Sequence, residues 1–212
     1  MKKILVAAVL VSLSLSAMAQ GEISLPVPNK KVKMTLFDAL QQRHSVRSYQ
    51  SASVGLSLLS QLLWAACGYN RPAQQMSTAP SALNAQDIDV YVVRADGAYR
   101  FDRQANRLVR VSTADLRPMV AGRQTAVASA PLMLVLVSDR ARFTKIADDQ
   151  AAARMGLVDA GYVSQNICLA CTALGLATVP RATMDAEALH TALGLAATQV
   201  TLINHPVGWE SK

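Results

Sequence analysis

The sequence is poor in cysteine, in aromatic residues and in charge. Its 212 residues include only three cysteines, too few for the disulfide framework of a small secreted domain. Charged residues make up 17% and hydrophobic residues 51%, which excludes a disordered, highly charged chain. Only one long apolar run occurs, at the N-terminus, so a protein with several membrane spans is excluded as well. What remains is a chain long enough for one domain of ordinary size, or two very small ones, with a real core.

The N-terminus has the three parts of a secretory signal. Lys2 and Lys3 precede an apolar run over residues 4–15, and Ala17-Met18-Ala19 supplies small residues for cleavage before Gln20. An uncleaved anchor helix is the alternative, but the run is shorter than the roughly 20 apolar residues that a span needs. We therefore expect a signal peptide over residues 1–19 and an exported, periplasmic protein without a membrane span after cleavage.

Apolar periodicity and helix breakers divide the rest of the chain into an arm and one domain. Residues 20–34 contain two prolines, three lysines and no apolar periodicity, which predicts an extended arm. The domain, residues 35–212, begins with a helix for which Thr35 and Asp38 form a capping box. Further helices are predicted at 57–66, 113–120 and 149–174, and a short one is capped by Thr183 and closed by Gly194. Strands are predicted at 88–93, 99–101, 108–111, 131–137 and 200–204, and a long loop at 68–86.

These elements do not alternate as strand and helix. A doubly wound parallel sheet is therefore not indicated, and the order predicts an α+β fold. The run 131–137 is apolar throughout, which is typical of a strand that is buried on both faces.

Three segments could carry chemistry. Arg43-His44-Ser45-Val46-Arg47 follows the first helix, and two guanidinium groups beside a hydroxyl suit a phosphate; the alternative is a helix end with cations against its dipole. The segment 77–86 concentrates small, hydroxyl and amide side chains that could bind a planar polar ligand, or it could be a plain loop. The segment 175–181 contains Val179-Pro180, which forces an extended backbone, but alone it is an ordinary connection between helices.

Taken in order, these segments resemble the FMN-dependent nitroreductase family. Arg43 to Arg47 resembles its Arg-x-Ser-x-Arg opening, and residues 80–86 resemble its Pro-Ser-x-x-Asn-x-Gln loop. Residues 161–180 are similar to its central helix with the loop that follows, and residues 193–208 to its C-terminal strand and turn. The resemblance extends over about residues 35–209.

The resemblance implies a nitroreductase-like fold: a central, mostly antiparallel sheet flanked by helices, in an interlocked homodimer with one FMN in each of two interface clefts. It implies that Arg43, His44, Ser45 and Arg47 contact the phosphate, ribityl chain or ring edge. A second group of contact residues would come from the partner subunit: Pro80, Ser81, Ala82, Leu83 and Asn84. A third group would lie along the flavin ring: Val179, Pro180, Arg181 and Ala182. Gly208 and Lys212 would lie at the phosphate end.

The function implied is transfer of reducing equivalents from NADH or NADPH, through FMN, to a small organic acceptor such as a nitro compound or a quinone. No dedicated catalytic side chain is required, because the flavin carries the chemistry. Two departures from the family pattern support an alternative, a non-catalytic flavin- or ligand-binding protein on the same fold. The loop after Val179-Pro180 reads Arg181-Ala182-Thr183 where many members have an acidic residue and a glycine, and only Lys212 remains of a C-terminal basic pair.

Other signals favour structural roles. Cys168 and Cys171 have redox spacing, but they lie inside an apolar helix, where cysteine behaves as a small hydrophobic residue. The three histidines are dispersed, so no metal site is predicted. Seven arginines between Arg94 and Arg123 form a basic stripe. We expect neither exposed aromatic residues within it nor a known reading module, so it is more typical of a solvated face than of a nucleic-acid site.

Overall fold

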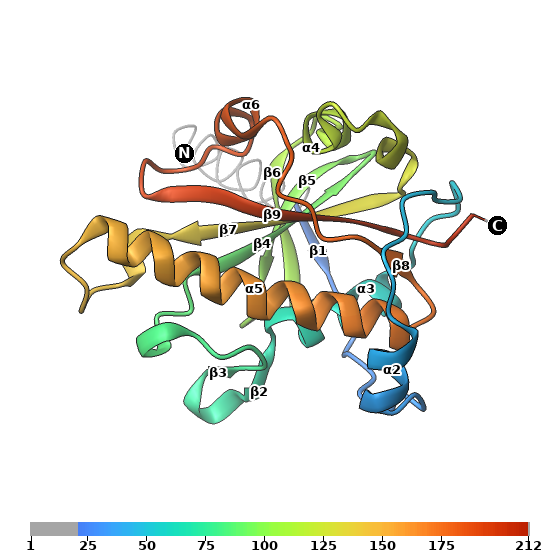
Figure 1. The fold of residues 1–212 in the computed structure, drawn as a ribbon, viewed down its shortest axis with the longest axis horizontal. Helices are drawn as coiled ribbons and strands as arrows, with labels where there is room; N and C mark the ends of the chain where they lie inside the picture. Colours follow the sequence, from blue (N-terminus) through green and yellow to red (C-terminus); the bar gives the residue numbers. More distant parts are fainter. Residues whose placement is uncertain (1–20, 212) are drawn as a thin grey trace, which may run out of the picture.

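A seven-stranded sheet is the centre of the molecule (Figure 1). The structure is a computed structural model that describes residues 21–211, so the predicted signal peptide and Lys212 lie outside the described residues. The strand order is β1-β6-β5-β4-β7-β9-β8, and every neighbouring pair is antiparallel. The bounds are β1 (Glu22–Ser24), β4 (Ile88–Arg94), β5 (Gly97–Asp102), β6 (Arg107–Ser112), β7 (Leu132–Asp139), β8 (Ala177–Thr178) and β9 (Gln199–Gly208). The predicted α+β class is confirmed.

The sheet has a hydrophobic core on each face. Successive side chains of a strand point to opposite faces. Leu134 of β7 accordingly packs with α3 (Leu56–Cys67) and α5 (Asp149–Ala173), whereas Met133 and Val135 pack with α4 (Arg117–Ala121) and α6 (Ala186–Ala192). Figure 1 shows α5 crossing one side of the sheet, with α4 and α6 together on the other. Burial on both faces explains why the sequence of β7 is continuously apolar.

The long helix α5 is the element that connects the candidate site segments. Asp148 caps its N-terminus by accepting hydrogen bonds from the backbone N–H groups of Gln150 and Ala151. Gly175, with a φ of +70°, reverses the chain after its last turn. At about 1.5 Å per residue, its 25 residues span about 37 Å. The helix predicted at 149–174 is therefore confirmed.

The first helix, α2 (Leu36–Gln42), also begins as predicted. The side chain of Thr35 accepts from the backbone N–H of Asp38, and the carboxylate of Asp38 accepts from the backbone N–H of Thr35 in return. The helix ends at Arg43, so the predicted anion-binding segment starts directly at its C-terminus.

Two predicted helix starts are wrong. The helix predicted from Thr113 begins at Arg117, because Pro118 has no N–H to donate and fits only the first turn. The last helix is capped by Asp185 and not by Thr183; the Asp185 carboxylate accepts from the backbone N–H of Ala188. In both cases β-strand or loop geometry continues further than the local pattern indicates.

Several short strands were not predicted. Three residues of the arm form β1 and pair with β6, and the predicted loop 68–86 contains a small hairpin of β2 (Tyr69–Arg71) and β3 (Met76–Ser77). The last strand continues past Asn204 through Pro206, because β7 pairs with it as far as Val207. These pairings depend on partners distant in sequence, so local patterns do not reveal them.

The cysteines are core residues, as expected. Cys67, Cys168 and Cys171 are free and buried, and burial raises the pKa of each thiol. No group of metal-ligating side chains occurs between residues 21 and 211. Within the same range, no helix has the length and apolar character needed to cross a membrane.

Candidate functional site

The Arg43 to Arg47 segment is an extended turn fastened to the sheet through Val46. The backbone N–H of Val46 donates to the carbonyl of Thr178 in β8 at 3.1 Å, and the Val46 side chain is buried. Because an extended chain alternates its side chains, Ser45 and Arg47 point outward and are exposed. The turn thus presents its polar groups beside the loop that follows α5.

Arg43 and Arg47 are not neutralised within the described part of the chain. Neither forms an ion pair between residues 21 and 211, whereas six other arginines do: Arg94, Arg107, Arg117, Arg140, Arg142 and Arg154. Two guanidinium groups and a hydroxyl on one exposed turn therefore form a donor set for an anion. The chemistry of this set fits a phosphate ester.

His44 is directed to the C-terminal segment. Its Nε2 lies 3.6 Å from Oε1 of Glu210, and its Nδ1 lies 2.9 Å from the carbonyl of Gln42. That carbonyl and then the Glu210 carboxylate raise the pKa of His44. A cavity of about 190 Å³ lies between this segment, the end of α5 and β8, and Glu210 is on its wall.

The segment predicted as the second ligand contact is a strained turn. Leu83, Asn84 and Gln86 have φ values of 55°, 55° and 48°, in the left-handed region that side chains rarely adopt. Two hydrogen bonds hold the turn: Gln86 N–H donates to the Ser81 hydroxyl at 2.7 Å, and Ala82 N–H donates to the carboxylate of Asp159 at 3.0 Å. Leu83 and Asn84 are exposed at its tip. Strain of this kind is frequent where a chain contacts a ligand.

The third segment turns its charged side chain into the protein. Arg181 is 7% exposed, and its backbone pairs with Asn204 of β9 in both directions. The guanidinium donates to the carbonyls of Val120 and Ala121, to the side-chain oxygen of Asn204 and to that of Gln124. Its Nη2 is 2.7 Å from the Ala121 oxygen. The groups exposed to solvent here are Pro180 and Ala182 on either side of it.

Gly208 is the end of β9 and is buried. A Cβ at this position would lie 2.5 Å from Cδ of Pro131, so the strand approaches the proline ring too closely for any side chain. Gly208 pairs with Ala177 of β8, next to the Arg43 to Arg47 segment. Lys212, predicted beside it, lies outside the described residues.

A single chain brings together only some of the predicted site residues. The first and third segments are adjacent through the bond between Val46 and Thr178. The turn at 81–84 contacts Asp159 in the middle of α5, whereas the cavity beside His44 reaches Thr172 near its end. These two helix positions are about 20 Å apart at 1.5 Å per residue. One copy of the chain therefore has two half-sites at different places along α5.

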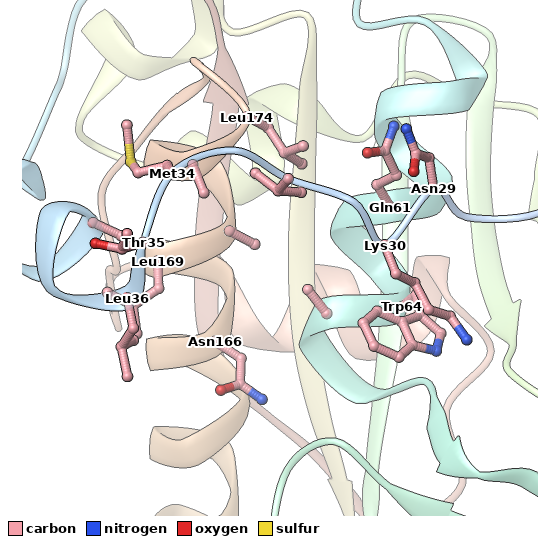
Figure 2. Close-up of a pocket in the computed structure, with 15 residues that line it drawn as sticks. Asn29, Lys30, Met34, Thr35, Leu36, Gln61, Trp64, Asn166, Leu169 and Leu174 are labelled. Carbon is pink, nitrogen blue, oxygen red and sulfur yellow. The ribbon is translucent and has the colours of Figure 1, made fainter.

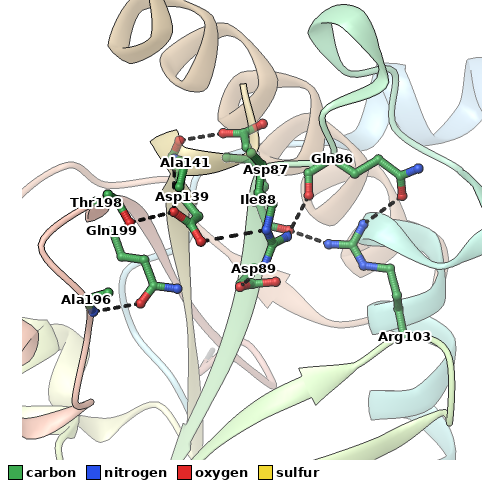
Figure 3. A network of polar contacts seen from close by, with 12 residues as sticks. Gln86, Asp87, Ile88, Asp89, Arg103, Asp139, Ala141, Ala196, Thr198 and Gln199 are labelled. Atoms are coloured by element: carbon green, nitrogen blue, oxygen red, sulfur yellow. Dashed lines mark hydrogen bonds and ion pairs between the residues drawn. The ribbon is translucent and has the colours of Figure 1, made fainter. Parts of the chain in front are cut away.

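A buried carboxyl cluster beneath the strained turn was missed by the sequence reasoning. Asp87, Ser138 and Asp159 are 0%, 2% and 2% exposed, and Figure 3 shows Asp87 at the start of β4 among the polar contacts of this region. The hydroxyl of Ser138 donates to Asp87. The residues come from β4, β7 and α5, so no sequence spacing connects them.

An apolar cavity of about 270 Å³ was also not predicted. It lies between the arm, α2, α3 and α5 (Figure 2), and the ammonium of Lys30 is 4.6 Å from the ring centre of Trp64 at its edge. None of the predicted site residues lines it. Its walls are mainly aliphatic, so it contributes no group for redox chemistry.

The basic stripe is partly neutralised. Arg94, Arg107 and Arg117 pair with Asp96, with Glu22 and Asp102, and with Asp115, respectively. Pairing of this kind supports the prediction of a solvated face.

Comparison with known proteins defines the class. Residues 40–209 match the sequence profile of the Nitroreductase family, and the fold is that of solved nitroreductases. Two relatives bear the name "putative nitroreductase". One, from Methanocaldococcus jannaschii, is 31% identical over 156 residues, which are 69% of this chain and 78% of that protein. The other, a crystal structure from Ralstonia eutropha JMP134, has a TM-score of 0.82 and 30% identity over 90% of both chains.

A third structure, nitroreductase A from Vibrio parahaemolyticus, has a TM-score of 0.63 and 22% identity, covering 84% of this chain and 70% of its own. It shares the fold. The chain belongs to the nitroreductase family, and its activity is that of a flavin-dependent oxidoreductase.

Proposed function

We propose that this protein is an FMN-dependent oxidoreductase that passes reducing equivalents from NADH or NADPH to a small organic acceptor, such as a nitro compound or a quinone. The observation that carries the proposal is the donor set of Arg43, Ser45 and Arg47 beside the loop 179–182. Ser45 and Arg47 are exposed, Arg43 is half-buried, and neither arginine has a carboxylate partner in the described chain. Bound FMN would supply the hydride chemistry. The residues of the chain bind and orient it.

The roles of these residues follow from what they offer. Arg43, Ser45 and Arg47 would hold the phosphate and ribityl chain, with His44 beside them. Pro180 and Ala182 would expose backbone along the ring, while Arg181 fixes that backbone from inside. The turn from Pro80 to Asn84, with Leu83 at its exposed tip, would complete the site from a second subunit. The predicted export signal would place this activity in the periplasm.

A second copy of the chain is proposed because the half-sites are separated along α5. The outward face of α5 exposes Leu157, Val158 and Tyr162 by 56%, 47% and 46%, and α2 exposes Leu36, Phe37 and Leu40. Apolar surface of this extent is typical of an interface. Packing two α5 helices together would bury it and bring the turn of one subunit to the arginines of the other.

Flavin binding and reduction test the function. We expect the purified protein to show a flavin absorption band, or to acquire one when FMN is added. NADH or NADPH should bleach the band without oxygen, and a nitroaromatic compound or a quinone should restore it. A protein that does not bind FMN would contradict the proposal. Binding without reduction by either donor would instead support the non-catalytic flavin-binding alternative.

Removing either arginine should weaken FMN binding. For Arg43→Ala and for Arg47→Ala we expect a loss of more than about 1.5 kcal/mol, somewhat over tenfold in Kd, because a charged hydrogen bond to phosphate is lost. Quenching of flavin fluorescence on binding measures the Kd. Arg107→Ala, which removes a paired arginine at the edge of the sheet, serves as the control and should leave the Kd unchanged. Equal affinity in all three variants would refute the assignment.

Charging the outer face of α5 should separate the subunits. The double variant Leu157→Glu, Val158→Asp would place two carboxylates in the proposed interface, where they lose hydration without gaining partners. Sedimentation should then give a monomer, against a dimer for the unmodified protein, and FMN binding should be lost with it. Val200→Glu changes an apolar residue of β9 that is 38% exposed, and this variant should remain dimeric. A dimeric double variant would place the interface elsewhere.

A further inference from the structure

The strained turn at 81–84 is fastened by a buried carboxylate. Both oxygens of Asp159 lie within 3.1 Å of the backbone nitrogen of Ala82, and Asp159 is 2% exposed. Ala82 is the first residue of the turn, followed by the left-handed Leu83 and Asn84. A conformation with this strain persists only where its surroundings fix it. Asp159 is the side chain that fixes it from α5.

A second buried carboxyl lies against Asp159. Asp87 is fully buried, lines the same small cavity as Asp159, and accepts a hydrogen bond from the hydroxyl of Ser138. α5 can approach β7 closely because residue 156 is glycine. A Cβ there would lie 2.4 Å from the Ser138 side-chain oxygen and 3.3 Å from Oδ2 of Asp87. Oδ1 of Asp87 has no partner among the described residues. The packing therefore brings two carboxyls together in a site that offers few hydrogen-bond donors.

Ionising both carboxyls of a buried pair is unfavourable, because their like charges repel in a site with little solvent. Burial raises the pKa of Asp87 to about 7, the Ser138 hydroxyl opposes that rise, and the neighbouring Asp159 reinforces it. At pH 6 the Asp87 carboxyl is therefore mainly protonated and carries no charge against its neighbour. Asp159 accepts from the backbone N–H of Ala82.

The other charged groups around the pair have partners of their own. Arg142 binds Asp89 of β4 and the carbonyl of Gln86. Arg103 binds the carbonyl of Ile88 (Figure 3). From β7, the backbone N–H of Asp139 donates to the Asp87 carbonyl. At the end of α3, the buried thiol of Cys67 has its pKa raised by burial. None of these side chains donates a hydrogen bond to the Asp87 carboxyl within residues 21–211.

We propose that the Asp87 and Asp159 carboxyls form an anchor that holds the 81–84 turn in its ligand-contacting shape, so that FMN binds less tightly when both are ionised. This inference rests on the proposed flavin site. Both residues are positioning residues, since they act through the backbone of Ala82. When Asp87 loses its proton, repulsion between the two carboxylates displaces Asp159 and weakens its bond to Ala82.

Amide hydrogen exchange and FMN binding together test the anchor. In the unmodified protein we expect the exchange of Ala82 N–H, corrected for its intrinsic pH dependence, to accelerate at least fivefold between pH 6 and pH 8.5, and the Kd for FMN to rise similarly. Asp87→Asn keeps residue 87 uncharged at every pH and should remove both changes. Asp159→Ala removes the acceptor and should weaken binding roughly tenfold at pH 6. Asp96→Asn, in the exposed β4–β5 turn, should behave as the unmodified protein.

The comparison with Asp87→Asn also removes the titration of the FMN phosphate, which is present in every variant. An unchanged pH response in Asp87→Asn, or none in the unmodified protein, would overturn the anchor. The exchange measurement needs no flavin. If FMN fails to bind at any pH while Ala82 exchange follows the expected pattern, the proposed function fails and the carboxyl anchor of the turn stands.

Discussion

Replacing Arg181 by methionine should lower the free energy of unfolding by about 1–3 kcal/mol. The guanidinium makes side-chain hydrogen bonds to α4, to Gln124 and to Asn204 inside the protein. Methionine preserves the apolar stem but leaves the carbonyl of Val120 without a donor, whereas that of Ala121 keeps the backbone N–H of Gln124. An unpaired buried polar group costs about 1–3 kcal/mol. Urea unfolding of the two proteins at pH 7 measures the difference.

The matched control is Arg123→Met. Arg123 is exposed beside α4, so its replacement should change the stability by less than about 0.5 kcal/mol. A loss under 1 kcal/mol for Arg181→Met would show that the buried network contributes little. The expected result would explain why this chain has arginine where many family members have an acidic residue: the side chain joins the loop 179–182 to α4 and β9, and does not face a ligand.

Acid should destabilise the protein through His205. Its imidazole is fully buried between the hydroxyls of Ser164, at 2.8 Å, and Thr178, at 3.2 Å, and burial lowers its pKa from 6.5 to about 3. Below pH 6.5 the imidazole of His205 is protonated in the unfolded chain but stays neutral in the folded protein. The stabilising contribution is therefore complete above pH 6.5 and decreases as the pH falls toward 3. Between pH 7 and pH 4 the loss is about 3 kcal/mol.

The contribution of Asp87 to stability has the opposite pH dependence. The effect of His205 is therefore measured in a variant that lacks the Asp87 carboxyl. Its raised pKa makes protonation favour the folded state, so its contribution is present below pH 3.8 and is lost as the pH rises through about 7. We therefore expect urea unfolding of Asp87→Asn to show a steeper loss of stability below pH 6.5 than the unmodified protein. Adding His205→Gln, which does not titrate, should remove most of that slope. A slope independent of residue 205 would contradict the prediction.

Elements whose signals are local were predicted well. The capping box of Thr35 and Asp38, the glycine stop at Gly175 and the apolar run of β7 each depend on residues within one turn or one strand. The helix starts at Thr113 and Thr183 were wrong because a nearby proline or aspartate fits the first turn better. The short strands β1 and β8 depend on distant partners and were missed.

The family can be recognised from the amino-acid sequence, because the three motifs keep their order along the chain. The same motifs identify the segments that present arginine, serine and small residues. How those segments are held depends on tertiary packing. It turned Arg181 inward to carbonyls of α4, placed the 81–84 turn on Asp159, and put Asp87 against that carboxyl through the missing side chain of Gly156. The reason is that burial and pairing depend on residues dozens of positions apart, whose proximity is created by the packing of α5 on the sheet.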